Sequence, residues 1–473
     1  MLTVYAKENL FHETYQDIII DPNSDFILDK VLLTIIELRN SPTIFSRCMK
    51  ILEVDIKENV NTELGRKGMP LFTRFCLYLI KKTLNLTYDF LRDLVLNHKA
   101  VRQLIEINTK YGTSLDKELT SGFSKTALKE NLSLISSDSV DKINEIIVKF
   151  GINKISDYKA TKCDIKTDSS VVQTNIEFPT DTGLLMDAME VLFRMLNQLS
   201  AESGCETFRQ SKKILKNLKK LIRSLHQTKN ADKRKSIAKE LICLAKNYAD
   251  RAQIINEGIT NDNLVVLKNR FQTFINYVFK FTDQIQRRVI NGELIPHSEK
   301  VFSVFKPHTE WIVKGKTGVI CELGIKVLIS SNQYNLIVGH EIMQNKQDVD
   351  VIVDHVKDIL KNQHITSISC DKGFHSKDNQ KTLSGLVETV VIPQKGKLSQ
   401  ERKEHESDPK FINIRKQHAE IESNISGLCS MGYAKCRDVS LEKFKTHVSM
   451  TIVARNLWSI GTFLLKKFKK STS

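Results

Sequence analysis

The sequence lacks the markers of several specialised protein classes. Its nine cysteines are an odd number and include no Cys-x-x-Cys pair, which argues against a disulfide framework or a zinc ribbon and is typical of reduced thiols. No Gly-rich Walker stretch occurs, which argues against an ATP-driven mechanism. No period of roughly 20–50 residues is repeated, so a repeat array is not expected.

Long apolar runs are also missing. No uncharged segment approaches the roughly 20 apolar residues that a membrane-spanning helix needs. The first residues, Met1–Glu8, lack a basic region followed by an apolar one. We therefore expect a soluble, cytoplasmic protein without a membrane partner. The apolar run Phe463–Leu465 with the Lys-rich end behind it is expected to pack in the core, although an amphipathic membrane contact is an alternative.

Positive charge is abundant. Lys and Arg outnumber Asp and Glu by 71 to 55 among 473 residues, which gives a net charge of +16. Such an excess favours a polyanionic partner, because each cation that neutralises a phosphate releases counterions. Charge alone does not separate DNA from RNA or from anionic lipid.

The hydrophobic pattern divides the chain into four parts. Residues 1–155 have helical periodicity, and residues 156–186 have strand character around Asp168. We expect the helical part, 1–155, to be a DNA-binding domain. Residues 187–299 are again helical and rich in Lys and Arg. Strands alternate with helices over residues 300–473. This alternation predicts an α/β fold with a mixed sheet flanked by helices.

Two helical segments are candidates for DNA contact. Leu71–Ile80 and Tyr88–Leu96 are joined by a short turn, a layout that can place one helix in a DNA groove, although a plain helical bundle explains it equally well. Arg209–Arg223 has an apolar stripe on one face and cations on the other. That basic face either contacts the DNA backbone or is merely solvated. Asp181 or Thr182 is expected to cap the helix before this segment.

The expected elements of the C-terminal part follow from the same patterns. Strands are predicted at 320–330, 336–343, 365–370 and 389–393, and helices at 349–360, 379–387, 410–431 and 443–465.

Three carboxylates stand on separate predicted elements. Asp168 lies in the first strand region, Asp371 ends an apolar strand before a glycine turn, and Glu422 lies in a helix. Hard divalent ions such as Mg²⁺ prefer oxygen ligands and need only a few protein carboxylates. Two such ions can activate a nucleophile and stabilise the leaving oxygen at a phosphodiester. Glu310 and Glu322 are fallback candidates for the upstream acid.

Three sequence blocks carry a family resemblance. Thr167–Leu185 resembles the first catalytic block of bacterial insertion-sequence transposases with a DDE active site. Cys370–Ser376, with its Asp-x-Gly-aromatic continuation, is similar to their second block, and Gln417–Ile425 is similar to their third. The likeness extends from about residue 70 to residue 460, and the blocks occur in the expected order.

That resemblance implies a ribonuclease-H-like core in which Asp168, Asp371 and Glu422 are catalytic and bind Mg²⁺ or Mn²⁺, with two ions expected. The helical stretch 187–299 would be an insertion between the first strand and the rest of the sheet. The implied activity is cleavage of transposon ends and joining of the 3′-hydroxyl to target DNA. The implied partners are double-stranded DNA and a second copy of the chain, in the bacterial cytoplasm at the nucleoid.

The third block departs from the family pattern. Related transposases often carry Arg one turn before the last Glu, where this chain has His418, and Arg415 one turn further back is a substitute. On a continuous helix, Arg415, His418 and Glu422 share one face. Glu420 competes with Glu422 for the last acid, and the shared face favours Glu422.

Five basic or histidine side chains near these blocks are expected to contact DNA. They are Lys372, Lys395, Lys397, Arg415 and His418. The runner-up functions are a related metal-dependent DNA nuclease that cleaves without joining, and a transposase-derived, non-catalytic DNA-binding protein.

Overall fold

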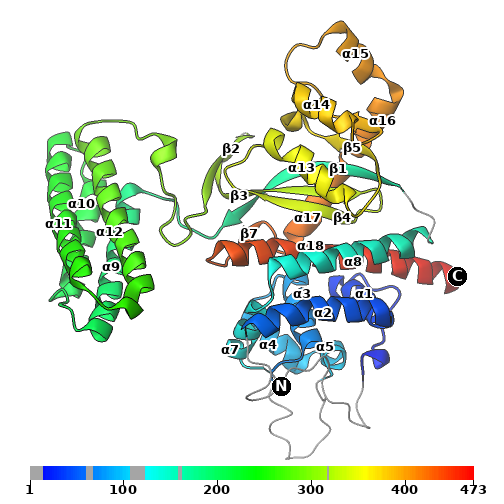
Figure 1. Ribbon diagram of the computed structural model, residues 1–473, viewed down its shortest axis with the longest axis horizontal. Coiled ribbons are helices and arrows are strands. Elements are labelled where there is room, and N and C mark those ends of the chain that lie inside the picture. The colour runs from blue at the N-terminus through cyan, green and yellow to red at the C-terminus, as the bar shows by residue number, and fades with distance from the viewer. Residues whose placement is uncertain (1–13, 60–67, 107–122, 158–161, 317–318, 473) are drawn as a thin grey trace, which may run out of the picture. The chain divides into compact units, whose positions relative to one another are not determined.

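The protein forms two compact units in a computed structural model that describes residues 14–59, 68–106, 123–157, 162–316 and 319–472 (Figure 1). Unit 1 comprises Met1–Asn175 and Ile312–Ser473, and unit 2 comprises Ile176–Trp311. The chain therefore leaves unit 1 once and returns to it. The helical insertion predicted at 187–299 lies within unit 2, and the predicted N-terminal part, 1–155, is grouped with the sheet in unit 1.

A mixed sheet is the centre of unit 1. Its strands are β1 (Cys163–Thr174), β2 (Glu310–Lys316), β3 (Val319–Asn332), β4 (Ile337–Met343), β5 (Ile365–Cys370), β6 (Thr389–Val391) and β7 (Lys435–Cys436). The order is β2-β3-β1-β5-β6, with β4 also paired to β3 and β7 to β1. Strand β1 pairs antiparallel with β3 and parallel with β5, and β5 pairs parallel with β6.

Helices cover both faces of this sheet. Those of the C-terminal part are α13 (Asp348–Leu360), α14 (Lys377–Ser384), α15 (Gln400–Ser407), α16 (Pro409–Gln417), α17 (Glu420–Ser430) and α18 (Leu441–Thr472). Val327 and Ile329 of β3 pack with Ile421 of α17 and Phe444 of α18, whereas Leu328 between them belongs to a second apolar cluster. This alternation is the period of two that a sheet buried on both faces requires. The mixed sheet flanked by helices confirms the predicted ribonuclease-H-like α/β fold.

The N-terminal helices share the second cluster. They are α1 (Ile27–Arg39), α2 (Pro42–Asn59), α3 (Leu71–Thr83), α4 (Tyr88–Asn97), α5 (Lys99–Leu104), α7 (Lys125–Ser133) and α8 (Ser137–Ser156). Helices α1, α3 and α8 all pack against α18. Helix α18 is long and apolar enough to cross a membrane, but 83% of its apolar window is buried within the protein. Its composition is therefore that of a core helix.

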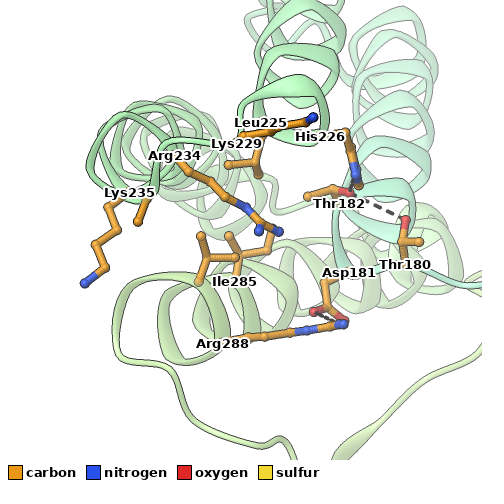
Figure 2. A pocket seen from close by; sticks show the side chains of 12 residues that line it. Thr180, Asp181, Thr182, Leu225, His226, Lys229, Arg234, Lys235, Ile285 and Arg288 are labelled. Atoms are coloured by element: carbon orange, nitrogen blue, oxygen red, sulfur yellow. Dashed lines mark hydrogen bonds and ion pairs between the residues drawn. The ribbon is translucent and has the colours of Figure 1, made fainter.

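Unit 2 is a bundle of four long helices with a core of its own. They are α9 (Asp181–Ser203), α10 (Ser211–Gln227), α11 (Ala231–Gly258) and α12 (Val265–Ile285), followed by a π-helical turn at Gln286–Ile290. Leucines and aromatic residues of all four helices form one buried cluster. A cavity of about 450 Å³ opens among the ends of these helices, and Figure 2 shows the side chains that line it.

Most predicted elements are confirmed, and two predictions are wrong in detail. The helix expected over 410–431 is interrupted at His418 and Ala419, where the backbone N–H groups of Ile421 and Glu422 donate to carbonyls only three residues back. The cap of α9 is Thr180, whose hydroxyl accepts from the Gly183 N–H, so neither Asp181 nor Thr182 is the cap. Thr180 has the extended backbone that a cap needs, whereas the helix already begins at Asp181.

Candidate active site

The register of two parallel strands brings the first two predicted acids together. Thr167 of β1 is opposite Cys370, the last residue of β5. The next residues along the two strands are Asp168 and Asp371, so both carboxylates lie at the same level of the sheet. This is the carboxyl end of β5, and crevices at such strand ends are the usual ligand sites of α/β sheets.

Asp371 is held by two basic side chains. Its Oδ1 lies 3.3 Å from Arg415 Nη1 and 3.5 Å from His418 Nε2. His418 and then Arg415 hold the pKa of Asp371 below its ordinary value, against the opposing effect of burial. Arg415 also donates to the Cys370 carbonyl at 3.1 Å, and His418 Nδ1 lies 3.0 Å from the Ser369 hydroxyl. These contacts fix the turn that carries Asp371.

Asp168 has the opposite electrostatic character. Its pKa is raised to about 6, mainly by burial and also by the charges of Asp371 and Asp348, against the lowering effect of the Ser169 N–H and of His418. The Ser169 N–H donates to Asp168 Oδ1 at 2.7 Å. Carboxylates that converge in a partly buried place disfavour each other's charge. A divalent cation bound there would relieve this repulsion.

The two candidates for the last acid have different surroundings. Glu420 pairs with Lys166, a buried side chain of β1. Glu422 is exposed in the first turn of α17, and its carboxylate makes no ion pair or hydrogen bond with any described residue. Because the helix is interrupted before Glu420, Arg415 and His418 lie at the end of α16 and Glu422 lies on the next helix. The single helix expected to carry these three residues is thus divided into two at residues 418 and 419.

A fourth carboxylate, which was not predicted, lies near Asp168 and the turn after Asp371. Asp348 begins α13, its Oδ2 is 3.5 Å from Lys326 Nζ, and its Oδ1 is buried without a hydrogen-bond partner among the described residues. A Cβ placed on Gly373, two residues after Asp371, would lie 3.1 Å from Asp348 Oδ2. No sequence signal identifies Asp348, because acids in the first turn of a helix are common for electrostatic reasons alone.

Three exposed lysines surround this edge of the sheet. Lys372 follows Asp371 directly, and Lys395 and Lys397 lie in the loop after β6. Lys395 Nζ reaches the Gly373 carbonyl at 3.4 Å, so this loop lies against the turn that follows β5. Arg415 is half-buried, and His418 is 6% exposed. Burial therefore distinguishes His418 from the three lysines among the predicted DNA contacts.

The fallback acids lie away from this place. Asp168 is opposite Ile329 of β3, whereas Glu322 stands seven residues earlier on the same strand. At about 3.3 Å per residue, seven residues correspond to roughly 23 Å. Glu310 begins β2, which is separated from β5 by β3 and β1 in the strand order. Asp168 is therefore the upstream acid that lies beside Asp371.

The donor set fits a hard divalent cation. Asp168, Asp371, Glu422 and Asp348 offer only carboxylate oxygens, the ligands that Mg²⁺ and Mn²⁺ accept. The unpartnered buried oxygen of Asp348 fits the same use. The oxygens of the three predicted acids do not all lie within 4.8 Å of one another. Among the described residues, the group that meets this distance is Cys436, Asp438 and His447.

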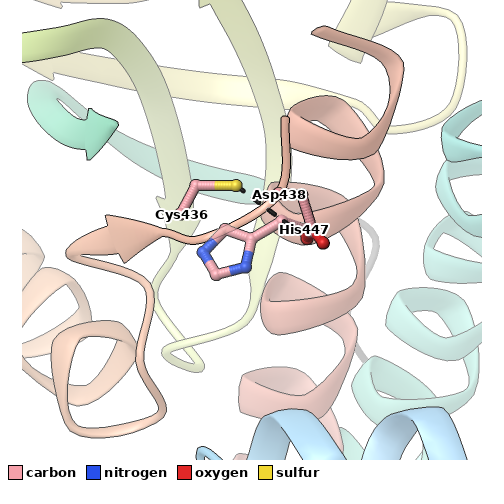
Figure 3. A group of neighbouring side chains, drawn as sticks. All are labelled: Cys436, Asp438 and His447. Atoms are coloured by element: carbon pink, nitrogen blue, oxygen red, sulfur yellow. Dashed lines mark hydrogen bonds between the residues drawn. The ribbon is translucent and has the colours of Figure 1, made fainter. Parts of the chain in front are cut away.

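That second group already contacts a cation of the chain. Figure 3 shows the Cys436 thiol, the Asp438 carboxylate and the His447 ring facing one another. The ammonium of Lys82 lies 2.5 Å from His447 Nδ1, and His447 Nε2 lies 3.4 Å from the Tyr433 carbonyl. Both ring nitrogens thus have partners. Burial lowers the pKa of Lys82 to about 8, and it lowers the pKa of His447 as well.

Comparison with protein families gives a match on the part of the chain that carries two of the three acids. Residues 322–457 match the family model described as the transposase DDE domain. This range contains Asp371, Glu422, Arg415 and His418, and it begins after Asp168 and unit 2. Neither the curated proteins nor the solved structures gave a match.

Proposed function

We propose that this chain is an insertion-sequence DDE transposase that cuts transposon ends and joins them to target DNA. The match of residues 322–457 to the transposase DDE domain supports this proposal. The observation that carries this proposal is the register of β1 and β5, which sets Asp168 beside Asp371. Their mutual charge effect supports a shared cation.

We assign the metal site to Asp168, Asp371 and Glu422. One or, as we propose, two Mg²⁺ or Mn²⁺ ions would supply charge stabilisation at the reacting phosphate and acidify a water. Asp348 is a fourth oxygen donor at the same place. The fit rests on a donor set made of carboxylates and on the unpartnered oxygen of Asp348.

The reaction has two balanced steps. Water oxygen attacks phosphorus at the transposon end, the bond from phosphorus to the 3′-oxygen breaks, and that oxygen takes a proton to become a free 3′-hydroxyl. The 3′-hydroxyl oxygen then attacks a target phosphorus, the bond from that phosphorus to the target 3′-oxygen breaks, and the proton of the attacking hydroxyl passes to this leaving oxygen. Each step forms one bond to phosphorus and breaks one, so no external energy source is needed.

Arg415 and His418 have positioning roles in this proposal. Both contact Asp371, and Arg415 also holds the preceding carbonyl. The burial of His418 favours orientation of Asp371 over a phosphate contact. Lys372, Lys395 and Lys397 are exposed at the same edge, and we propose that they bind phosphates of the DNA.

The partners follow from the chemistry. We propose that the substrate is double-stranded DNA that bears the ends of the element and the target, that two copies of the chain act together on paired ends, and that the protein works at the nucleoid in the cytoplasm. A nuclease that cleaves without joining would share the metal site. A non-catalytic DNA-binding protein would not need it.

Cleavage of labelled duplex DNA carrying the ends of the element tests the proposal. Wild type and Asp371→Asn are compared with Mg²⁺, with Mn²⁺ and with EDTA. We expect metal-dependent nicking at the element boundary and joined products with target DNA, both abolished by the substitution. Nicking without joined products would favour the nuclease. Binding without nicking in either metal would favour the non-catalytic protein.

The choice between Glu422 and Glu420 is tested by a matched pair of substitutions. Glu422→Gln is expected to abolish nicking and leave the melting temperature unchanged, because this exposed carboxylate has no described partner. Glu420→Gln is expected to retain nicking but to lose about 1–3 kcal/mol of stability, because it weakens the pair with buried Lys166. The opposite result would assign the last acid to Glu420.

A further inference from the structure

The positive charge of the protein is concentrated in one short segment of unit 2. Residues 209–239 contain twelve Lys and Arg residues and one acidic residue, Asp232, a net charge of +11 within a chain whose total is +16. All twelve cationic side chains are exposed. The segment covers α10 and the first turns of α11. Two-thirds of the net charge thus lies within 31 residues.

The cations of α10 share one face. Lys212, Lys216, Lys219 and Arg223 follow one another at spacings of four, three and four residues. At 3.6 residues per turn they form a straight row, here called the α10 stripe, about 16 Å long. Leu218, Leu221 and Leu225 on the opposite face are buried in the bundle. Burial of that face directs the stripe to solvent.

The stripe has no ion-pair or hydrogen-bond partner among the residues that the structure describes. Helix α10 contains no Asp or Glu, and no ion pair or side-chain hydrogen bond among the described residues involves any of the twelve cations of residues 209–239. Arg287, elsewhere in unit 2, differs from the stripe because it forms ion pairs with the carboxylates of Asp283, Glu293 and Glu299. Like charges at such spacings destabilise a helix. The stripe therefore lowers the stability of α10 with no local compensation.

Two cavities border this helix. One, of about 590 Å³, lies beside Lys213, Lys216 and Lys220, with Tyr248 of α11 on its wall. The other, at the far end of α10, is lined by Lys229 and Arg234 among others. Figure 2 shows Arg234 extending into that cavity, whereas Lys235 points away from it. Cationic side chains therefore line both the cavity beside the stripe and the cavity at the C-terminal end of α10.

We propose that the α10 stripe binds the phosphate backbone of duplex DNA outside the active site. A duplex carries about one charge per 1.7 Å of its axis, so the length of the stripe covers roughly ten phosphates. Single-stranded nucleic acid is usually held on aromatic side chains. Helix α10 has no Phe, Tyr or Trp, and Tyr248 beside it packs against Phe193 and Phe208. A membrane-bound helix must insert its apolar face, and that face is buried here.

Only the identification of the ligand as duplex DNA rests on the proposed function. The stripe itself takes no part in the cleavage or joining of DNA. Because phosphate contacts carry no sequence information, the stripe would hold DNA of any sequence. Its cations are separate from those beside Asp371, so binding and cleavage are measured independently.

The test uses the full-length protein in EDTA with a fluorescent 30-base-pair duplex of arbitrary sequence. The stripe variant is Lys216→Gln with Lys219→Gln and Arg223→Gln. The matched control is Arg194→Gln with Lys246→Gln and Arg270→Gln, which removes the same charge from exposed positions of unit 2 outside residues 209–239. Affinity is measured by anisotropy from about 50 to 200 mM KCl, a range over which phosphate contacts are strongly screened. Melting curves establish that both variants are folded.

We expect the stripe variant to bind at least about tenfold more weakly, and its salt slope to fall by about 2–3, since each lost phosphate contact contributes about 0.9. The control should keep the slope of the wild type. Equal losses of DNA affinity in the two variants would overturn the proposal. So would a wild type that prefers double-stranded RNA or phosphatidylserine vesicles to duplex DNA and loses this binding in the stripe variant. At low salt and saturating DNA the stripe variant should still nick with metal. Stripe-dependent binding by a wild type that never nicks would overturn the proposed function alone.

Discussion

At the scale of single residues, the candidate site joins two carboxylates with opposite electrostatic settings. Asp371 is kept charged by His418 and Arg415, whereas Asp168 is disfavoured as an anion by burial and by nearby acids. A metal ion at the proposed site would bind the charged form of both. The charged form of Asp168 therefore destabilises the metal-free folded protein, and a bound cation would restore that stability.

The pKa of Asp168 has a consequence for stability in the absence of metal. Its folded value of about 6 exceeds the reference value of 3.8, so the folded state binds more protons than the unfolded state between these values. Stability is lost as pH rises through that window, and above it the penalty is constant at about 3 kcal/mol. Asp168→Asn should therefore stabilise the metal-free protein at pH 8 and have little effect near pH 4.

Thermal unfolding in EDTA across this pH range measures the difference between wild type and Asp168→Asn. Addition of Mg²⁺ provides the complementary control, because a ligand of the folded state stabilises by mass action. It should raise the melting temperature of wild type and leave that of the variant nearly unchanged. A gain in stability that is the same at pH 4 and pH 8 would contradict the burial of a charged Asp168.

Sequence reasoning found the acids whose local pattern is distinctive and missed the one whose role depends on packing. Asp371 is recognisable because it ends an apolar strand before a glycine turn. Asp348 is not, because α13 brings it beside Gly373 only in the folded protein. The burial of His418 was equally hidden, since its contact with Ser369 joins residues 49 positions apart.

At the scale of elements, periodicity predicted the strands and helices well and failed at one interruption. Residues 418 and 419 keep helical backbone angles, so no breaker residue marks the place. The change is confined to the hydrogen bonds, which turn from four-residue to three-residue spacing. A pattern of apolar residues does not record that change.

The crossing of α18 with α1 depends on a glycine. A Cβ on Gly461 would lie 1.9 Å from the carbonyl oxygen of Lys30 in α1. Gly461→Ala must push the two helices apart, and we expect a loss of about 3 kcal/mol in unfolding free energy. Gly258→Ala in α11 is the matched control, because no atom lies within 4 Å of its added Cβ.

For the control we expect wild-type stability or a gain of up to about 1 kcal/mol, because Ala favours the helix over Gly. Denaturant unfolding of the two variants under the same conditions gives both values. If Gly461→Ala were as stable as Gly258→Ala, the close contact of α1 with α18 would be wrong.

At the scale of the whole molecule, unit 2 is a continuous segment with a separate core. Its buried cluster contains residues of unit 2 alone, and its 136 residues, 176–311, are within the usual size of an independent domain. The isolated segment should therefore fold by itself. We expect a helical circular dichroism spectrum and one cooperative melting transition. A segment that remains unfolded would show that its core depends on unit 1.

Composition indicated where in the chain a helical insertion lies. It did not indicate which side chains close that segment. A basic helical stretch between a strand and the rest of an α/β pattern indicates an insertion, because it interrupts the sheet in sequence. The limits of the compact unit, 176–311, extend beyond the predicted 187–299, since Phe178 and Trp311 pack against each other. That contact joins the two ends of the segment. No local sequence pattern predicts it, because the two residues are far apart in the chain.

The interrupted sheet also sets an order of events during synthesis on the ribosome. Strand β1 ends at Thr174, and β3, its antiparallel neighbour, begins at Val319. At a synthesis rate of about 5–20 residues per second, β1 is therefore made roughly 7–30 s before its first partner strand. An unpaired strand invites association with other chains. Asp164, Lys166 and Asp168 are placed at every second position of β1, and such charges act as gatekeepers against aggregation. The acid proposed to hold metal in the folded protein would thus also oppose aggregation of the nascent chain.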